Sequence, residues 1–211
     1  MHQSTQFTEF KSPLGLLLLA SRAEALAGLY FEEHKPKPRR DGSWRRDAGP
    51  FKTAREQLEA YFAGDLVEFD LPTSLEGTDF QRRVWNSLRR IPIGETCTYS
   101  HVAKRVKRPT AVRAVGAAIG RNPISIVIPC HRVIGSDGTL TGYAGGMDRK
   151  QWLLRHEASV RLRTVVGRPS QAVRSGRRPG KAVSLVEMGN DSRPGSTPAT
   201  GHQTQPPSIG P

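Results

Sequence analysis

Cys130 is the residue of this chain whose type and setting are best suited to covalent chemistry. It lies in the run Ile-Pro-Cys-His-Arg-Val, directly before His131 and Arg132. A free cysteine has a pKa of about 8.5, so it becomes a nucleophile near neutral pH only in an electropositive setting. The imidazole of His131 and the charge of Arg132 both favour thiolate over thiol. Most single buried cysteines are inert packing residues, and this run alone leaves that alternative open.

A catalytic imidazole needs a third group that fixes its tautomer, and Glu157 is the candidate carboxylate for His131. We expect Glu157 to lie in a helix over residues 148–157. A surface glutamate beside His156 is the alternative that spacing leaves open. Successive side chains on a strand point to opposite faces, so His131 reaches the sulfur directly only if the backbone turns sharply. A bridging water is the other route.

The segment before Cys130 should position the thiol. Residues 124–128 are Ile-Ser-Ile-Val-Ile, a run rich in β-branched side chains that predicts a buried strand. Pro129 has no N–H and cannot continue a sheet ladder, so the strand should open into a loop at the thiol.

Two short helices joined by a tight link predict a helix-turn-helix further upstream. The first would cover residues 99–106, with Ser100 as a possible cap, and the second would run from residue 109 to about residue 120. Small residues dominate the second helix and would let its backbone approach a groove closely, while Arg113 is its only charge. A helical hairpin in an ordinary core has the same spacing and remains the alternative.

A third helix should precede this motif. Thr78 and Gln81 have the spacing of a capping box, and an apolar face follows them until residues 92–94, where the helix should stop. Cys97 then reads as a packing residue. With only two cysteines and no Cys-x-x-Cys spacing, neither a disulfide framework nor a structural zinc site is expected.

The first part of the chain reads as β structure followed by a helix. Three short apolar runs predict an antiparallel meander over residues 6–10, 16–20 and 25–31. Residues 34–50 should form a loop, and the next apolar residues have helical spacing, namely Phe51, Ala54, Leu58 and Phe62. Gly64 should end that helix, and residues 66–71 could add one more strand.

These elements predict a chain of three parts. Residues 1–76 would form a small α/β domain with an antiparallel sheet and a helix, and residues 77–165 a mainly α domain with a winged-helix-like helix-turn-helix. Residues 166–211 contain 7 Pro, 7 Gly and 6 Ser and no aromatic residue, so we expect a disordered tail.

The net charge of +13 is unevenly distributed. Residues 77–165 carry 16 Lys and Arg against 5 Asp and Glu, whereas residues 1–76 carry 10 against 12. A basic excess confined to one segment favours a polyanion as partner, with nucleic acid first, although a well-solvated basic face is the alternative. No apolar run approaches the roughly 18 residues of a membrane span, and residues 14–20 are too short for a signal peptide. A reducing cytosol is therefore the expected compartment.

Several ordered motifs resemble the O6-alkylguanine-DNA alkyltransferases, continuously over about residues 77–160. They are Phe80-Gln-Arg-Arg-Val-Trp85, Ile91-Pro-Ile-Gly-Glu95, Thr98-Tyr-Ser100, Arg113-Ala-Val-Gly116, Arg121-Asn-Pro123, Pro129-Cys-His-Arg-Val133, Gly142-Tyr-Ala-Gly-Gly146 and Trp152-Leu-Leu-Arg-His-Glu157. The order of these motifs, with His131 directly after Cys130, argues against a zinc site. It also argues against a papain-like hydrolase, whose catalytic histidine is remote from the cysteine in sequence.

The resemblance implies a single, irreversible transfer of an alkyl group from guanine O6, and also from thymine O4, to Cys130. It makes His131 the water-bridged base and Glu157 its partner. Tyr99 would hydrogen-bond the guanine ring and offset its charge, and Asn122 would brace the active-site turn. Without the family, a core tyrosine and a loop-capping asparagine are the simpler interpretations of these two residues.

The resemblance also implies a duplex partner with the damaged base flipped out, because the alkylated atom is unreachable inside a base stack. Arg113 would fill the gap. The implied DNA contacts further include Tyr99, Thr110, Ala114, Gly116 and Arg121, and the implied base pocket consists of Val133, Gly142, Tyr143, Ala144 and Gly145. Ala144 takes a position where some members have Ser, which leaves the range of alkyl groups open.

No cofactor and no metal are expected, because the first domain lacks the cysteine of the family's zinc-binding members. The protein should act as a monomer, in the cytoplasm or, in a eukaryote, the nucleus. Two alternatives remain. Relatives that bind alkylated bases without repairing them lack the motif cysteine, which is present here. A plain helix-turn-helix regulator would need a dimerisation element and a more polar recognition helix.

Overall fold

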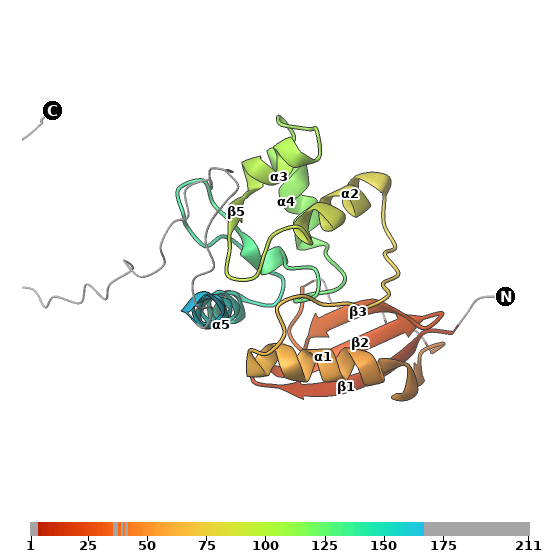
Figure 1. Ribbon diagram of the computed structural model, residues 1–211. Coiled ribbons are helices and arrows are strands. Elements are labelled where there is room, and N and C mark those ends of the chain that lie inside the picture. Colours follow the sequence, from red (N-terminus) through yellow and green to blue (C-terminus); the bar gives the residue numbers. More distant parts are fainter. Residues whose placement is uncertain (1–3, 36–37, 39, 41, 167–211) are drawn as a thin grey trace, which may run out of the picture.

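The structure is a computed structural model that describes residues 4–35, 38, 40 and 42–166. Two layers follow one another along the chain, a sheet with a covering helix and then a group of helices (Figure 1). The tail expected over residues 166–211 lies outside the described residues, apart from Val166 at its start. Within the described part, no helix is long and apolar enough to cross a membrane.

The predicted meander is confirmed. Strands β1 (Gln6–Ser12), β2 (Gly15–Arg22) and β3 (Ala25–Phe31) pair in antiparallel fashion, and the sheet order is β3-β2-β1-β4. The added strand β4 (Arg45–Arg46) pairs in parallel with β1, within a segment predicted to be only a loop. Alternate side chains such as Leu17 and Leu19 are fully buried, because one face of the sheet packs on the core.

One helix covers this sheet (Figure 1). A turn of 3-10 helix, Gly49–Phe51, leads into α1 (Lys52–Ala63), and Gly64 ends α1 with a φ of 84°, a left-handed conformation that glycine adopts without strain. The prediction of a strand over residues 66–71 is wrong, because this segment forms no strand. The side chain of Gln57 donates to the Asp70 carbonyl at 2.8 Å and accepts from the Asp70 N–H at 2.9 Å, so that backbone bonds to a side chain instead of to a sheet.

The capping box that begins the second domain is confirmed. Helix α2 (Asp79–Leu88) has Thr78 as N-cap, and Thr78 and Gln81 bond reciprocally to each other's backbone N–H. The helix ends four residues before Pro92. The N–H groups of Arg90 and Ile91 instead bond to carbonyls three residues back, in turns that follow the helix.

The helix-turn-helix consists of α3 (Tyr99–Arg105) and α4 (Val112–Gly120). Ser100 is not the cap of α3, because Thr98 accepts the His101 N–H at 3.2 Å. The second helix begins at Val112, three residues later than predicted. Its preceding link contains Lys107 with a φ of 58°, a left-handed turn that separates the two helices.

The strand predicted over residues 124–128 is wrong in conformation although right in burial. Ile126 has a φ of 70°, and the segment is a series of turns with one isolated bridge between Ile124 and Leu29 of β3. After it, a turn of 3-10 helix, Cys130–Arg132, leads into β6 (Val133–Ile134). Strand β6 pairs in parallel with β5 (Cys97–Thr98).

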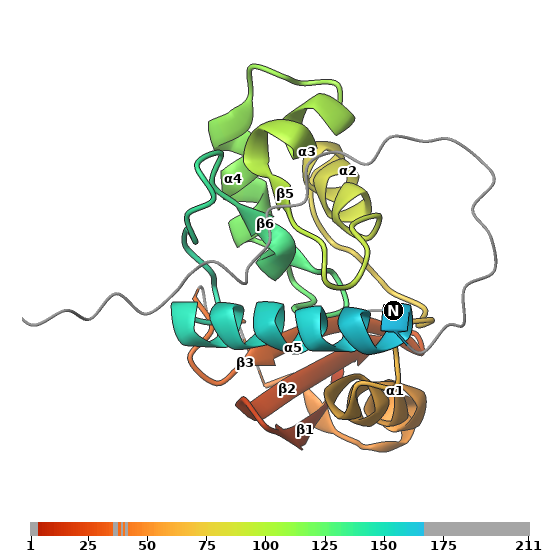
Figure 2. The same ribbon diagram turned by 60° about the vertical axis from the view of Figure 1, so that its left-hand side comes forward.

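Helix α5 (Met147–Val166) extends nine residues beyond the predicted helical segment, and in Figure 2 it runs along the sheet, with α2, α3 and α4 above it. Its Leu153 side chain is fully buried. One hydrophobic core includes residues of the sheet, of α1, of the helix-turn-helix and of the Cys130 turn. The site is thus built at the junction of the two layers.

Candidate active site

Cys130 begins the 3-10 turn and is only 5% exposed. Its sulfur accepts a hydrogen bond from Asn122 Nδ2 at 3.0 Å. The same nitrogen donates to the Ile128 carbonyl at 2.8 Å, and Asn122 Oδ1 accepts the Ile124 N–H at 3.1 Å. Asn122 therefore fixes both the turn and the sulfur, which is the location that the sequence predicted for it.

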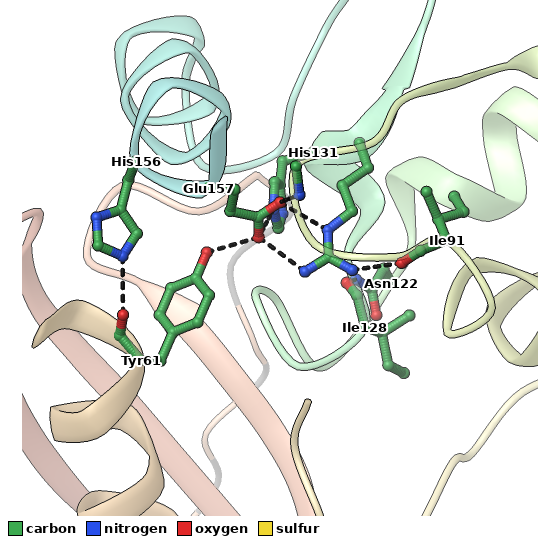
Figure 3. Close-up of polar contacts among 9 residues, drawn as sticks. Tyr61, Ile91, Asn122, Ile128, His131, His156 and Glu157 are labelled. Carbon is green, nitrogen blue, oxygen red and sulfur yellow. Dashed lines mark hydrogen bonds and ion pairs between the residues drawn. The ribbon is translucent and has the colours of Figure 1, made fainter. Parts of the chain in front are cut away.

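His131 and Glu157 are both fully buried and lie side by side, with Nε2 of the histidine 2.9 Å from Glu157 Oε1 (Figure 3). The surface-glutamate interpretation of Glu157 is therefore wrong. A carboxylate accepts hydrogen bonds, so Nε2 carries the proton and Nδ1 holds the lone pair. Nδ1 is buried and has no hydrogen-bond partner within the described part of the chain. The arrangement leaves it available as a base.

Glu157 accepts further hydrogen bonds, among them that of Tyr61, which Figure 3 shows. Arg132 donates from Nε and Nη2 at 2.8 Å each, Tyr61 of α1 donates its hydroxyl at 2.8 Å, and the Gly94 N–H donates at 3.3 Å. Burial alone would raise the pKa of Glu157. The hydrogen bond from His131 and the charge and hydrogen bonds of Arg132 outweigh it and hold that pKa well below its usual range.

Arg132 does not act on the sulfur as the sequence suggested. Its guanidinium bonds to Glu157 and to the Ile91 carbonyl, so its charge is engaged by the carboxylate (Figure 3). The cation that acts on Cys130 is Lys150, which is fully buried and donates to the carbonyls of Val133 at 2.7 Å and Thr141 at 2.9 Å.

Burial raises the pKa of Cys130 to about 11, against the hydrogen bond from Asn122 and the charge of Lys150, which lower it. The resting thiol is thus protonated near neutral pH, contrary to the prediction from the motif. Burial likewise lowers the pKa of Lys150 to about 8, opposed by Cys130. Burial also lowers the pKa of His131, although Glu157 opposes it, so the resting imidazole is neutral.

Sequence reasoning missed Lys150 and Tyr61. For Lys150 a signal existed, because Leu153 and Glu157 follow it at three and seven residues and share its helical face. A lysine on the face that buries Leu153 is unusual and marks a partner in the interior. Tyr61 had no local signal, since it lies 96 residues from Glu157 in sequence.

Tyr99 is the first residue of α3, and the pairing of β5 with β6 places it near the strand that follows the Cys130 turn. Its hydroxyl accepts a hydrogen bond from Thr141 at 2.9 Å. Gly116 of α4 faces its ring, because a Cβ added there would lie 3.7 Å from it. Tyr99 thus lies between α4 and the loop predicted to form the base pocket.

The remaining predicted DNA contacts lie at the two ends of α4. Thr110, Arg113 and Ala114 are exposed at its N-terminal end. Arg121 is exposed just beyond its C-terminal end, where it lines a cavity of about 300 Å³ together with Tyr30, Glu76 and other residues.

The predicted pocket residues lie close to the Cys130 turn but differ in exposure. Val133 is fully buried and Gly142 is exposed. The Tyr143 ring lies edge-on to His131, with 6.4 Å between ring centroids. Gly145 is buried, and a Cβ there would overlap the Phe31 ring of β3, so its lack of a side chain serves packing. The Ala144 carbonyl accepts the Lys35 N–H at 2.9 Å, which ties this loop to the first domain.

The fold and the site combine a helix-turn-helix with a buried cysteine that a cluster of polar side chains holds in place. Residues 79–159 match the family described as "6-O-methylguanine DNA methyltransferase, DNA binding domain", and residues 6–75 match its "ribonuclease-like domain". The chain belongs to this 6-O-methylguanine DNA methyltransferase family.

Individual relatives are similar over most of their length. The methylated-DNA–protein-cysteine methyltransferase of Methanosarcina acetivorans is 51% identical over 71% of this chain and 96% of its own. That of Mycolicibacterium paratuberculosis is 51% identical over 72% and 92%. Among solved structures, Mycobacterium tuberculosis OGT in complex with DNA has a TM-score of 0.71 at 49% identity, over 74% of this chain and 94% of that one.

Proposed function

We propose that this chain repairs duplex DNA by moving the alkyl group of an O6-alkylguanine, and of an O4-alkylthymine as a second substrate, onto the sulfur of Cys130. The observation that carries the proposal is the buried cluster in which Asn122 holds the sulfur and Glu157 orients His131. The names of the two methyltransferase relatives support the same reaction.

The transfer needs a base for the thiol proton. Glu157 accepts the Nε2–H of His131, so Nδ1 takes the proton of Cys130, through a bridging water. The thiolate attacks the alkyl carbon, and the S–C bond forms as the C–O6 bond breaks. The electron pair of the broken bond stays on the guanine, where the Tyr99 hydroxyl offsets its charge. The thioether is not reversed, so each molecule acts once.

Lys150 supplies the charge that the thiolate needs. A thiol of pKa about 11 is almost entirely protonated at neutral pH, so deprotonation has to accompany binding of the base. The buried Lys150 cation lowers the pKa of Cys130 and stabilises the thiolate when His131 removes the proton.

Access to the sulfur requires the base to leave the helix. Cys130 is 5% exposed and cannot reach an atom inside a duplex, and base flipping costs roughly a few kcal/mol of stacking and pairing. Helix α4 binds the duplex as the recognition helix, and Arg113 fills the gap in the base stack. Thr110, Ala114, Gly116 and Arg121 border the DNA, and the flipped base enters between Tyr99 and the wall formed by Val133, Gly142, Tyr143, Ala144 and Gly145.

The experiment is a mass measurement on a duplex that contains one O6-methylguanine. We expect the peptide with Cys130 to gain one methyl group per protein molecule, and the peptide with Cys97 to gain none. The protein should elute as a monomer before and after the reaction. An unmodified Cys130 in a protein that binds the lesion tightly would establish the competing function, recognition without repair.

A further inference from the structure

A second basic surface lies on the side of α2 that is turned away from the core. Val84, Trp85 and Leu88 of α2 are buried, whereas Arg83 on the other side of the helix is exposed. Arg90, in the turn that follows the helix, is exposed as well. Helix α2 contacts the recognition helix through its buried side, because Trp85 Nε1 donates to the Ala118 carbonyl at 2.8 Å. Arg83 therefore points away from α4.

These arginines line a groove between α2 and the end of α3. Its volume is about 590 Å³, and its lining consists of Arg83, Asn86, Ser87, Arg90, Arg105, Val106, Lys107 and Arg108. The lining includes five cationic side chains and no carboxylate. None of the five forms an ion pair within the part of the chain that the structure describes.

The groove concentrates cations that have no ion-pair partner among the described residues, whereas other arginines of the domain do have one. Elsewhere in the domain, Arg82 pairs with Asp79, and Arg161 pairs with Glu95 at 2.9 Å. Unpaired cations placed around one groove repel each other, and an anion that enters the groove removes that repulsion. The five cations gathered around one groove therefore favour a polyanion as its occupant.

The polar groups of the groove fit phosphate. Arginine binds phosphate oxygens in bidentate fashion, and hydroxyl and amide groups add single hydrogen bonds. The Ser87 hydroxyl is buried and has no hydrogen-bond partner among the described residues, and Asn86 adds an exposed amide.

We propose that this groove binds the phosphate backbone of a second DNA segment while α4 holds the first. Helix α2 packs on α4 through the side that holds Trp85, and Arg83 lies on its exposed side, so a duplex on α4 leaves the groove open. A protein that holds two segments passes directly from one to the other without first dissociating. The proposal rests on the proposed function only in taking α4 as the primary DNA site.

The test measures how fast the full-length protein passes from one duplex to another. A complex with a short labelled duplex is mixed with rising concentrations of unlabelled duplex, and loss of the label is followed in time. In the unaltered protein, the release rate should rise with competitor concentration. In the double variant Arg83→Gln with Arg90→Gln, that dependence should fall about tenfold and its salt dependence should weaken. The control, Arg155→Gln with Arg163→Gln on α5, removes the same charge and should behave like the unaltered protein.

Other outcomes overturn the proposal. If the groove variant loses affinity for a single short duplex, the groove contacts the same DNA as α4. If release never depends on competitor but polyglutamate binds the DNA complex through the groove, the groove is a protein-docking surface. Methyl transfer to Cys130, measured on the same samples, reports on the proposed function separately, because groove variants should react with a free O6-alkylguanine base at the normal rate.

Discussion

The two cysteines of this chain lie in adjoining segments, and burial raises the pKa of both to about 11. Cys97 of β5 pairs in register with Val133, three residues after Cys130. Their surroundings differ. The charge of Arg105 is the only effect that lowers the pKa of Cys97, whereas Asn122 and Lys150 both act on Cys130.

The comparison teaches that the resting pKa does not identify the reactive thiol. Both thiols are protonated at neutral pH, so reactivity has to come from groups that accept the proton and hold the charge when substrate binds. Only the Cys130 turn places a buried imidazole next to the sulfur in sequence and supports that imidazole with a carboxylate.

The largest expected effect comes from exchanging the sulfur itself. Cys130→Ser should abolish methyl transfer from O6-methylguanine, because a serine hydroxyl has a far higher pKa than a thiol. Cys97→Ser should retain the full stoichiometry, since its thiol has no such base. Mass spectrometry of both variants after reaction with a modified duplex measures this. If Cys97→Ser kept its fold but lost methyl transfer, the assignment of Cys130 as the only reactive thiol of the two would be wrong.

The next effect concerns charge at the sulfur. Lys150→Met removes the cation that lowers the pKa of Cys130, so that pKa should rise and the transfer rate at neutral pH should fall roughly tenfold to a hundredfold, or about 1.4–2.8 kcal/mol. A thiolate-dependent rate rises with pH up to the thiol pKa. The profile should therefore shift to higher pH in Lys150→Met.

The control for charge is Lys150→Arg, which keeps a cation and should recover part of the rate. Alkylation of Cys97 by iodoacetamide provides an internal reference, because its pKa is set by burial and Arg105 and should stay unchanged in both variants. A Lys150→Met profile that coincides with that of the unaltered protein would assign Lys150 a purely structural role, through its bonds to the Val133 and Thr141 carbonyls.

The sequence predicted the parts of this site that are local and missed those that depend on distant segments. Asn122, Cys130 and His131 lie within ten residues, and the motif around Cys130 indicated chemistry directly. The capping box of α2 was predictable for the same reason. Tyr61 was not, because its contact with Glu157 exists only once α1 and α5 pack.

Two errors have physical causes that a sequence does not display. The β-branched run at residues 124–128 reports burial, and Ile124, Ile126 and Ile128 are indeed fully buried, but Asn122 binds their backbone into turns. Arg132 was counted as a charge at the sulfur, yet Glu157 takes up that charge. Formal charges near a residue therefore predict its pKa poorly until their partners are known.

The smallest expected effect tests how many donors Glu157 needs. Tyr61→Phe removes one buried hydrogen bond to Oε1, while Arg132, His131 and Gly94 remain, so the carboxylate should stay charged and continue to orient His131. The transfer rate should change by less than about threefold, and the free energy of unfolding should fall by about 1–2 kcal/mol. Chemical denaturation and single-turnover kinetics measure the two quantities. Tyr30→Phe on β3 is the matched control, and a rate loss in Tyr61→Phe as large as that in Lys150→Met would mean that Tyr61 takes part in the proton transfer itself.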